Sequence, residues 1–224
     1  MHETSIMRSR SEEDYLKAIY SLWKNDEPIS TTDIANYLNM KASSVTDMLQ
    51  KLSDKGWINY KKYKGANLTD EGKKIALSII RKHRLWETFL VSNLHFKWDE
   101  VHEIAEQLEH IDSAELINRL DNYLGNPMYD PHGDPIPNKE GKIPKSFSIP
   151  LIELPVNKIG KVVGVSSDTP SFLQYLDKIN IQLGSTIKVK DKIEFDQSLE
   201  IIINDKNYQI SATVAKNILI NTKQ

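Results

Sequence analysis

A short segment near the middle of the chain carries imidazole and carboxylate groups at a helical spacing. His102, Glu106 and His110 stand at positions i, i+4 and i+8, and Glu109 borders the same stripe. Residues with this spacing share one face of a helix. Nitrogen and oxygen donors without sulfur favour Mn²⁺, Fe²⁺ or Co²⁺ over a structural zinc ion. The stripe therefore predicts a metal-binding surface, although an exposed acidic helix face with incidental histidines has the same pattern.

A second pair, His83 and Glu87, repeats the i, i+4 spacing about one helix earlier. If the two helices pack antiparallel, as a short connection favours, this pair approaches His102 and His110. A single pair of this kind is most often a surface contact that stabilises a helix only weakly. Its recurrence favours one metal site or two adjacent ones.

Composition limits the classes of protein to which the chain can belong. Its 224 residues suit two or three small domains, and 29 Lys and Arg against 31 Asp and Glu leave it nearly neutral. The charge is unevenly distributed, with eleven basic and four acidic residues from Lys41 to Arg84, but two basic and nine acidic residues from Leu85 to Asp121. A basic segment suits a phosphate backbone and an acidic one suits divalent cations.

The chain has no cysteine, which excludes disulfides, cysteine-ligated zinc, iron–sulfur clusters and thiol catalysis. Residues 1–10 lack the apolar segment of a signal peptide, and no run approaches the ~18 apolar residues that a membrane span needs. We therefore expect a soluble cytoplasmic protein without a membrane partner.

The N-terminal region has the residue pattern of a winged helix-turn-helix. The expected elements are helices at 11–25, 32–38 and 42–55 and a hairpin of strands at 57–60 and 66–69. Ser11 is the expected N-cap of the first helix, and Gly56 ends the third. The short helix, tight turn and longer helix predict a DNA-reading motif, and the hairpin predicts its wing.

Polar residues of the third helix and lysines of the hairpin form the expected contact surface for double-stranded DNA. They are Lys41, Ser43, Ser44, Thr46, Asp47, Lys51, Lys61, Lys62 and Lys64. Small hydroxyl side chains at the start of a recognition helix approach phosphates and base edges, while lysines bind the backbone. A winged helix used only for protein contact is the alternative.

The middle of the chain predicts a helical unit that pairs with a second copy. Helices are expected from 69 to about 93, from 98 onward and from Ser113 to Tyr123, each with an apolar face. A homodimer would place two recognition helices on the two half-sites of a pseudo-palindromic operator.

The remaining sequence predicts a turn-rich segment and a small β domain. In the Pro/Gly-rich segment 125–137, His132 and Asp134 can act as ligands, but local turn roles are the preferred interpretation. Short strands from about 154, interrupted by a helix at 170–178, predict an SH3-like barrel. The fold is thus expected to be mainly α with a small β domain. Its expected divisions are 1–74 (winged helix-turn-helix), 75–144 (metal binding and dimerisation), 145–154 (linker) and 155–224 (SH3-like domain).

Six motifs in order along the chain resemble the diphtheria toxin repressor and manganese transport regulator family. They are EDYLKAIY at 13–20, SSVT at 43–46, LTDEG at 68–72, RKHRL at 81–85, ExxEH at 106–110 and DPHGDPIP at 130–137. The resemblance covers the whole chain, including a C-terminal FeoA-type SH3-like domain. It implies a dimeric transcriptional repressor in which a metal ion acts as corepressor and controls metal-uptake genes.

The resemblance also implies the metal ligands. The primary site would use Asp14, Glu106, Glu109 and His110, the ancillary site His83, Glu87 and His102, and the third domain would add Asp168, with Ser171 as the other matching position. Glu106 and Asp14 stand where iron-type members carry Cys and Met, so hard oxygen replaces soft sulfur and makes Mn²⁺ the first choice. Fe²⁺ is the alternative, because His102 and the third domain belong to the iron-type branch.

Lys17 departs from the manganese-type pattern, in which a glutamate ligand stands at this position. A protonated lysine cannot bind a metal ion, so the residue argues against a binuclear site of that type. Asp14 belongs to the helix before the DNA-binding motif, whereas the other primary ligands belong to the dimer core. Metal binding would therefore tie the two bodies together and select the arrangement that binds DNA.

Two other functions fit parts of this sequence. Adjacent carboxylate and imidazole sites can activate water in a di-metal hydrolase, but the sequence shows no separate general base or substrate-phosphate loop. The FeoA likeness also suits a partner module of metal transport, although an attached winged helix argues against that as the main role. We therefore expect no enzyme activity.

Overall fold

The structure is a computed structural model of the 224-residue chain and describes residues 8–23, 27–144, 148–167 and 169–222. These residues form two compact units. The first holds the described residues up to 82 together with 109–112 and 137–142, and the second holds 83–108, 113–136 and the described residues from 143 onward. Within these ranges, no helix combines the length and apolarity needed to cross a membrane.

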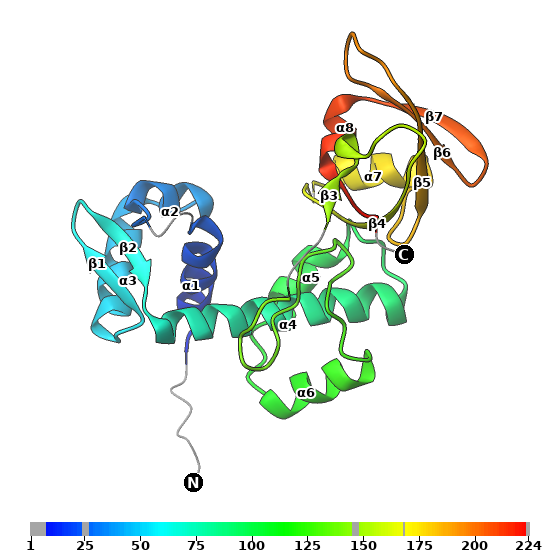
Figure 1. Cartoon of the computed structure of the whole chain (residues 1–224). Helices are drawn as coiled ribbons and strands as arrows, with labels where there is room; N and C mark the ends of the chain where they lie inside the picture. The colour runs from blue at the N-terminus through cyan, green and yellow to red at the C-terminus, as the bar shows by residue number, and fades with distance from the viewer. Residues whose placement is uncertain (1–7, 24–26, 145–147, 168, 223–224) are drawn as a thin grey trace. The chain divides into compact units, whose positions relative to one another are not determined.

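The first unit contains the predicted winged helix-turn-helix (Figure 1). Its elements are α1 (Arg10–Leu22), α2 (Thr31–Tyr37), α3 (Ala42–Asp54), the antiparallel strands β1 (Ile58–Lys61) and β2 (Gly65–Leu68), and the first part of α4 (Asp70–Leu94). Val45, Leu49 and Leu52 are buried along one side of α3, as the helical period predicts. The opposite side of α3 and the tip of the β1–β2 hairpin are exposed.

The N-cap of helix α1 lies two residues earlier than the sequence predicted. Ser9, and not Ser11, is the N-cap: its hydroxyl accepts the Glu12 N–H at 3.3 Å, and the Glu12 carboxylate accepts the Ser9 N–H at 3.0 Å. This is a capping box, in which two otherwise unpaired donors of the first turn are satisfied reciprocally. The reciprocal bonds explain why the helix starts at Arg10, because Ser11 has no glutamate or glutamine three residues later.

The helical part of the second unit contains the rest of α4 together with α5 (Val101–Leu108) and α6 (Ala114–Tyr123). Ser113 caps α6, because its hydroxyl accepts the N–H of Leu116. Helix α5 ends at Leu108, so the expected stripe over 102–110 is wrong beyond Glu106: Glu109 and His110 lie in the turn after the helix. The chain must leave the helical path there, because the N-cap of the next helix follows within five residues.

The β part of the second unit is an antiparallel sheet with the strand order β3-β8-β4-β5-β6-β7 (Figure 1). The strands are β3 (Ile149–Pro150), β4 (Ile159–Val165), β5 (Thr186–Lys192), β6 (Leu199–Ile203), β7 (Lys206–Ile210) and β8 (Ile218–Asn221), with a short 3₁₀ turn (Leu151–Glu153), α7 (Pro170–Lys178) and α8 (Ala212–Asn217). Bulges interrupt the β4–β8 and β5–β6 registers. The fold class is confirmed, but no pairing of β3 with β7 closes the sheet within the described residues.

Within the second unit, the turn at 130–137 is seated against strand β4. The Val165 N–H donates to the His132 carbonyl at 2.7 Å. Gly133 has φ +87°, and a Cβ there would lie 2.2 Å from the Cα of Gly164. Trp98 joins the hydrophobic core of the β part. The turn, the segment around Trp98 and the β part are therefore packed as one body.

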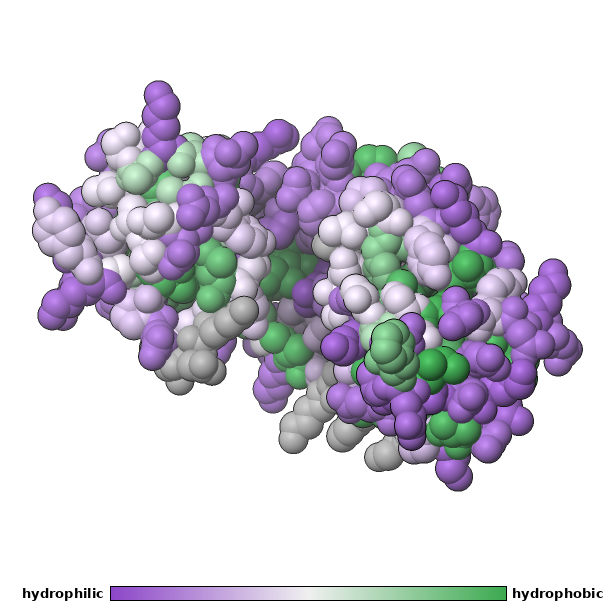
Figure 2. Space-filling model, turned by 90° about the horizontal axis from the view of Figure 1, so that it is seen from above, coloured by the Kyte–Doolittle hydropathy of each residue, from purple (hydrophilic) through white to green (hydrophobic). Residues whose placement is uncertain are grey.

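Hydrophilic residues cover most of the face of each unit that Figure 2 shows, and hydrophobic residues reach the surface in separate patches. Leu116 and Tyr123 on α6 are among the exposed large hydrophobic residues, at 39% and 68% exposure. Exposed apolar side chains on a helix that also contributes to a core suit an interface with another chain.

Candidate metal centres

The first candidate centre lies in the first unit and joins α1 to the turn after α5. Asp14, Glu109 and His110 each offer a ligand atom, and these atoms lie within 4.8 Å of one another. Nε2 of His110 is 3.2 Å from Asp14 Oδ1 and 3.9 Å from Glu109 Oε1. Two carboxylates and one imidazole thus converge on one point, as a divalent cation requires.

Glu13 orients the imidazole of this first centre. Its Oε2 lies 2.7 Å from Nδ1 of His110, and its Oε1 accepts a hydrogen bond from Arg8 Nε at 3.3 Å. When Nδ1 donates to Glu13, the lone pair of Nε2 is directed at Asp14 and is open to a metal ion. Sequence reasoning missed Glu13; the available signal was its place beside Asp14 in an acidic first turn.

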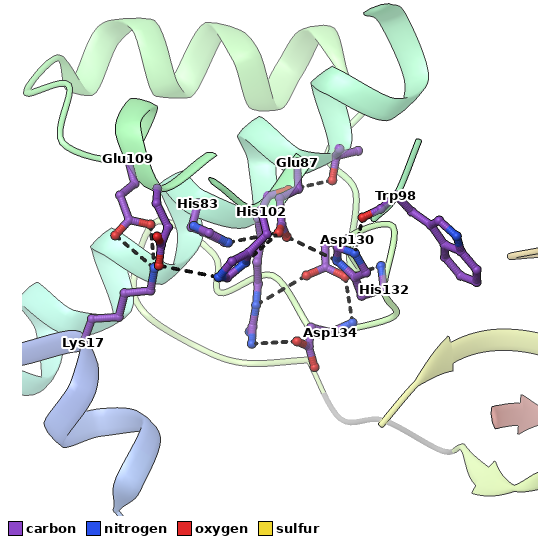
Figure 3. Close-up of polar contacts among 12 residues, drawn as sticks. Lys17, His83, Glu87, Trp98, His102, Glu109, Asp130, His132 and Asp134 are labelled. Atoms are coloured by element: carbon purple, nitrogen blue, oxygen red, sulfur yellow. Dashed lines mark hydrogen bonds and ion pairs between the residues drawn. The ribbon is translucent and has the colours of Figure 1, made fainter. Parts of the chain in front are cut away.

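The second candidate centre surrounds Glu87, a buried carboxylate on α4 toward which three imidazoles point (Figure 3). Its Oε1 lies 3.0 Å from His83 Nε2 and 3.4 Å from His102 Nδ1, and its Oε2 lies 3.5 Å from His132 Nδ1. Burial alone would raise the pKa of Glu87, but the contacts with His102, His132 and His83 lower it well below its usual range. A charged carboxylate is thus held inside the unit.

Glu87 belongs to two overlapping groups of ligand atoms. His83, Glu87 and His102 form the predicted ancillary group, and Glu87, Asp130 and His132 form a second one whose members are all buried. His132 Nε2 contacts the Trp98 carbonyl at 2.9 Å, so Nε2 carries a proton and Nδ1 faces Glu87. Burial lowers the pKa of His132, but the hydrogen bond and charge of Glu87 and the charge of Asp130 raise it to about 9.

The two carboxylate oxygens of Asp130 show whether a metal ion fits the second candidate centre. Its Oδ1 accepts the N–H groups of His132 and Asp134 at 2.8 and 2.9 Å. Its Oδ2 is buried and accepts no hydrogen bond from the described residues, with Arg84 Nε 3.6 Å away. Burial and the charges of Glu87 and Asp134 raise the pKa of Asp130 to about 7. A buried carboxylate oxygen that accepts no hydrogen bond, and that lies beside Glu87 and His132, fits a hard divalent cation.

The structure therefore separates the roles within the DPHGDP turn. Asp130 shapes the turn through its Oδ1, while the imidazole of His132 faces Glu87 instead of bonding within the turn. Asp134 contributes its N–H to the turn and its carboxylate to an ion pair with Arg84 at 3.4 Å. Asp130 and the orientation of His132 were missed from the sequence, because only the folded chain brings this turn to α4.

Three predicted ligand positions lie elsewhere. Glu106 belongs to the second unit, and its half-exposed carboxylate lies 3.5 Å from Nε2 of His102. Asp168 lies outside the described residues. Ser171 is exposed on α7 and makes no capping bond, since Thr169 is the N-cap.

The predicted DNA-contacting residues occupy one helix and one hairpin of the first unit. On or just before α3, Lys41, Ser43, Ser44, Asp47 and Lys51 are exposed, and Thr46 is partly buried; in the hairpin, Lys61, Lys62 and Lys64 are exposed. The Thr46 hydroxyl donates to the Ala42 carbonyl at 2.9 Å. Nζ of Lys51 lies 3.1 Å from Glu12 Oε1, so this lysine has a partner inside the unit.

The chain is similar to known proteins along most of its length. The chain matches three family models: "Iron dependent repressor, N-terminal DNA binding domain" at 7–66, "Iron dependent repressor, metal binding and dimerisation domain" at 69–138, and "FeoA domain" at 149–222. A solved manganese-dependent transcriptional repressor in complex with manganese is 34% identical, with a TM-score of 0.78, and the match covers 95% of this chain and 100% of that one. The chain belongs to the iron-dependent repressor family.

Two curated relatives extend the comparison. An uncharacterised HTH-type transcriptional regulator of Methanocaldococcus jannaschii is 43% identical over 113 residues, which are 50% of this chain and 90% of that protein. The iron-dependent repressor IdeR of Mycobacterium tuberculosis is 33% identical over 125 residues, 56% of this chain and 54% of that protein.

Family membership confirms several predictions from the sequence. The family comprises metal-dependent transcriptional repressors with manganese or iron regulation; they bind DNA through the N-terminal domain and dimerise through the metal-binding domain. Repressors of this family are not enzymes.

Proposed function

We propose that this repressor binds operator DNA when Mn²⁺, or alternatively Fe²⁺, occupies two centres. The first uses Asp14, Glu109 and His110, and the second is built around Glu87. The observation that carries the proposal is the convergence of Asp14, from the helix that precedes the DNA-reading motif, with Glu109 and His110 from the turn after α5. A metal ion there binds segments about ninety residues apart, one of which supports the DNA-reading helices.

The electrostatics of the first centre explain why metal would act as a corepressor. Glu13, Asp14 and Glu109 place three carboxylates around one imidazole. Carboxylates gathered this closely repel one another when they are charged, and Arg8 at Glu13 and Lys17 at Glu109 offset that repulsion only in part. A divalent cation removes the rest while drawing the ligands together. Metal binding therefore favours one arrangement of α1, and the DNA-binding arrangement gains population by the difference in metal affinity.

The second centre has two alternative ligand sets that share Glu87. The set with Asp130 and His132 is supported by its burial and by Oδ2 of Asp130, which accepts no hydrogen bond and has Arg84 as its ion-pair partner at 3.6 Å. The set with His83 and His102 matches the sequence resemblance. Glu106 and Asp168 also stay proposed ligands on that resemblance. Every donor is oxygen or nitrogen, which suits Mn²⁺ first and Fe²⁺ second.

The DNA complex follows from the same proposal. In a homodimer, two α3 helices enter successive major grooves of a pseudo-palindromic operator, and the wing lysines contact phosphates. The relatives whose names cite manganese or iron support metal-uptake genes as the targets and the cytoplasm as the location. We expect no hydrolytic activity.

The decisive experiment is fluorescence anisotropy on DNA selected from a random pool, at fixed ionic strength because salt alone changes such affinities steeply. The protein is titrated with Mn²⁺, with Fe²⁺ under anaerobic conditions, and with Zn²⁺. We expect tight binding only with metal, reversal by a chelator, and a response to Mn²⁺ at the lowest free concentration. Binding that ignores metal would overturn the proposal.

Asp14→Ala is the matching variant, because it removes a carboxylate of the first centre. It should abolish metal-dependent DNA binding while the dimer keeps its mass in light scattering. Glu27→Ala is the control, since Glu27 is an exposed carboxylate outside the candidate centres. Metal-dependent operator binding by Asp14→Ala would refute this assignment of the first centre.

A further inference from the structure

Glu12 is a buried acidic residue that belongs to neither candidate metal centre. It lies in the first turn of α1 and is only 1% exposed. Its Oε2 accepts the N–H of Ser9 at 3.0 Å. Its Oε1 lies 2.5 Å from Nζ of Lys55 and 3.1 Å from Nζ of Lys51. One carboxylate therefore joins the start of α1 to two lysines of another element.

Both lysines belong to the C-terminal end of the DNA-reading helix. Lys51 lies in the last turn of α3, and Lys55 is its C-cap residue. A cation at the C-terminal end of a helix also interacts favourably with the helix dipole, so the lysines are well placed there even without Glu12. The contact with Glu12 gives that end of α3 a fixed attachment point on α1.

Two side chains at the start of α1 point to opposite sides of the helix. Residues two apart on a helix are separated by about 200°, so Glu12 and Asp14 project from nearly opposite sides. Asp14 contacts His110 in the first metal centre, and Glu12 contacts α3. A single helical turn thus carries a metal ligand on one side and an attachment to the recognition helix on the other.

The capping box makes this attachment depend on the shape of the turn. The Glu12 carboxylate accepts the Ser9 N–H, and the Ser9 hydroxyl accepts the Glu12 N–H, only when the first turn is helical. A buried carboxylate that loses its partners pays a desolvation cost, which favours keeping Glu12 paired with its lysines even though these side chains are partly exposed. A change that makes the first turn of α1 helical therefore also sets the position of the Glu12 carboxylate. Through its lysine contacts, Glu12 then positions the C-terminal end of α3.

We propose that Glu12 is a positioning residue that couples the metal centre at Asp14 to the recognition helix α3 by holding Lys55 and Lys51. This inference rests on the proposed function, because it assumes that metal at Asp14 controls DNA binding. Metal that orders the first turn of α1 sets the orientation of α3 through this carboxylate. Glu12 itself does not touch the metal or the DNA.

The test compares Glu12→Gln with the wild-type protein in three measurements. They are Mn²⁺ affinity without DNA by calorimetry, DNA affinity in saturating Mn²⁺, and DNA affinity in chelator. Glutamine keeps the size of the side chain but removes its charge. We expect Mn²⁺ affinity to stay within about twofold, while the metal-induced gain in DNA affinity shrinks about tenfold or more.

Two further variants make the result specific. Lys55→Met removes the nearer of the two lysine partners of Glu12 and should also reduce the metal-induced gain. The double variant Glu12→Gln/Lys55→Met should lose no more than Glu12→Gln alone. Glu71→Gln is the matched control, because Glu71 is an exposed acidic residue in the first turn of α4. It should leave the gain unchanged.

The outcomes separate the inference from the function on which it rests. If wild-type DNA binding does not respond to metal, the proposed function fails and the inference falls with it. If the wild-type protein responds and Glu12→Gln keeps the full metal-induced gain, only the inference is overturned. A lower melting temperature with an unchanged gain would mean that Glu12 is merely structural, which also overturns it.

Discussion

The ammonium group of Lys17 contacts both carboxylate oxygens of Glu109, Oε1 at 3.0 Å and Oε2 at 2.7 Å. The Glu109 side chain is only 2% exposed, and that of Lys17 is 17% exposed. Without metal, the lysine thus supplies positive charge to a carboxylate that is proposed as a ligand. A divalent cation that binds Glu109 must compete with this ammonium, so Lys17 weakens metal binding while it stabilises the metal-free protein.

Lys17→Gln should therefore have opposite effects on the two states. Mn²⁺ affinity should rise about tenfold, because the competing charge is gone. The free energy of unfolding of the metal-free protein should fall by roughly 1–3 kcal/mol, because a buried carboxylate loses a charged partner. Calorimetry and urea unfolding in chelator measure the two quantities, with the exposed Lys74→Gln as control. Equal or weaker Mn²⁺ binding would show that Lys17 supports the occupied centre instead.

The two ligand sets around Glu87 can be separated by single substitutions. Glu87→Gln should abolish metal binding at the second centre, because Glu87 belongs to both sets. His132→Gln should weaken it more than His102→Gln, because the His132 side chain is 8% exposed and already held by the Trp98 carbonyl, whereas that of His102 is 52% exposed. His95→Gln, an exposed histidine, is the control. The number of Mn²⁺ ions bound, measured by calorimetry, distinguishes the two ligand sets. A larger loss of binding in His102→Gln than in His132→Gln would assign the centre to the set with His83 and His102.

The success of sequence reasoning depended on how local each relationship is. His83 and Glu87 were predicted to share a helix face, and on α4 the His83 Nε2 atom lies 3.0 Å from Glu87 Oε1. This contact could be predicted because it depends only on the i, i+4 spacing. The stripe through His110 failed because it needed α5 to continue past Leu108. The end of a helix depends on the start of the next one and on packing, which periodicity does not report.

Non-local contacts explain what the sequence did not reveal. His132 approaches Glu87 only because the 130–137 turn is seated on β4, and nothing in the spacing of 45 residues indicates this. The same holds for Glu13, whose contact with His110 joins positions 97 apart. The spacing of imidazoles and carboxylates indicated six of the proposed ligands and the resemblance added Asp14 and Asp168, while these buried neighbours required the structure.

Glu12 also predicts how stability depends on pH. Burial raises the pKa of its carboxyl, but the hydrogen bonds from Lys55, the Ser9 N–H and Lys51 lower it to about 2 from 4.5. An acidic group whose pKa is lower in the folded protein than in the unfolded chain stabilises the fold at pH values above the unfolded pKa. For Glu12, this contribution is lost as the pH falls from 4.5 toward 2. The lysine side chains are 31% and 54% exposed, so solvent screening reduces the effect to on the order of 1 kcal/mol.

Metal-free Glu12→Gln should accordingly be less stable than the wild-type protein at pH 7, with the difference shrinking below pH 4.5. Urea unfolding at several pH values and low salt measures this difference. Glu71→Gln is again the control, because its exposed carboxylate should leave the pH dependence unchanged. A difference that stays constant from pH 7 to pH 3 would mean that the lysine contacts do not stabilise the charged form.

Two glycines offer a matched test of how the 130–137 turn supports the second centre. Gly133 and Gly125 have φ +87° and +78°, so alanine at either position pays a similar backbone strain of about 1–2 kcal/mol. At Gly125 a Cβ meets nothing within 4 Å, whereas at Gly133 it would lie 2.2 Å from both the Gly164 Cα and the Val163 carbonyl oxygen. Backbone atoms cannot move aside as the end of a side chain can.

Gly133→Ala should therefore cost at least about 2 kcal/mol more than Gly125→Ala in urea unfolding, because the turn must shift away from β4. The shift would also break the hydrogen bond from the Val165 N–H to the His132 carbonyl and displace the imidazole from Glu87. We thus expect Gly133→Ala to weaken metal binding at the second centre, while Gly125→Ala leaves it intact. Equal stability and equal Mn²⁺ stoichiometry in the two variants would show that the contact between the turn and β4 does not position His132.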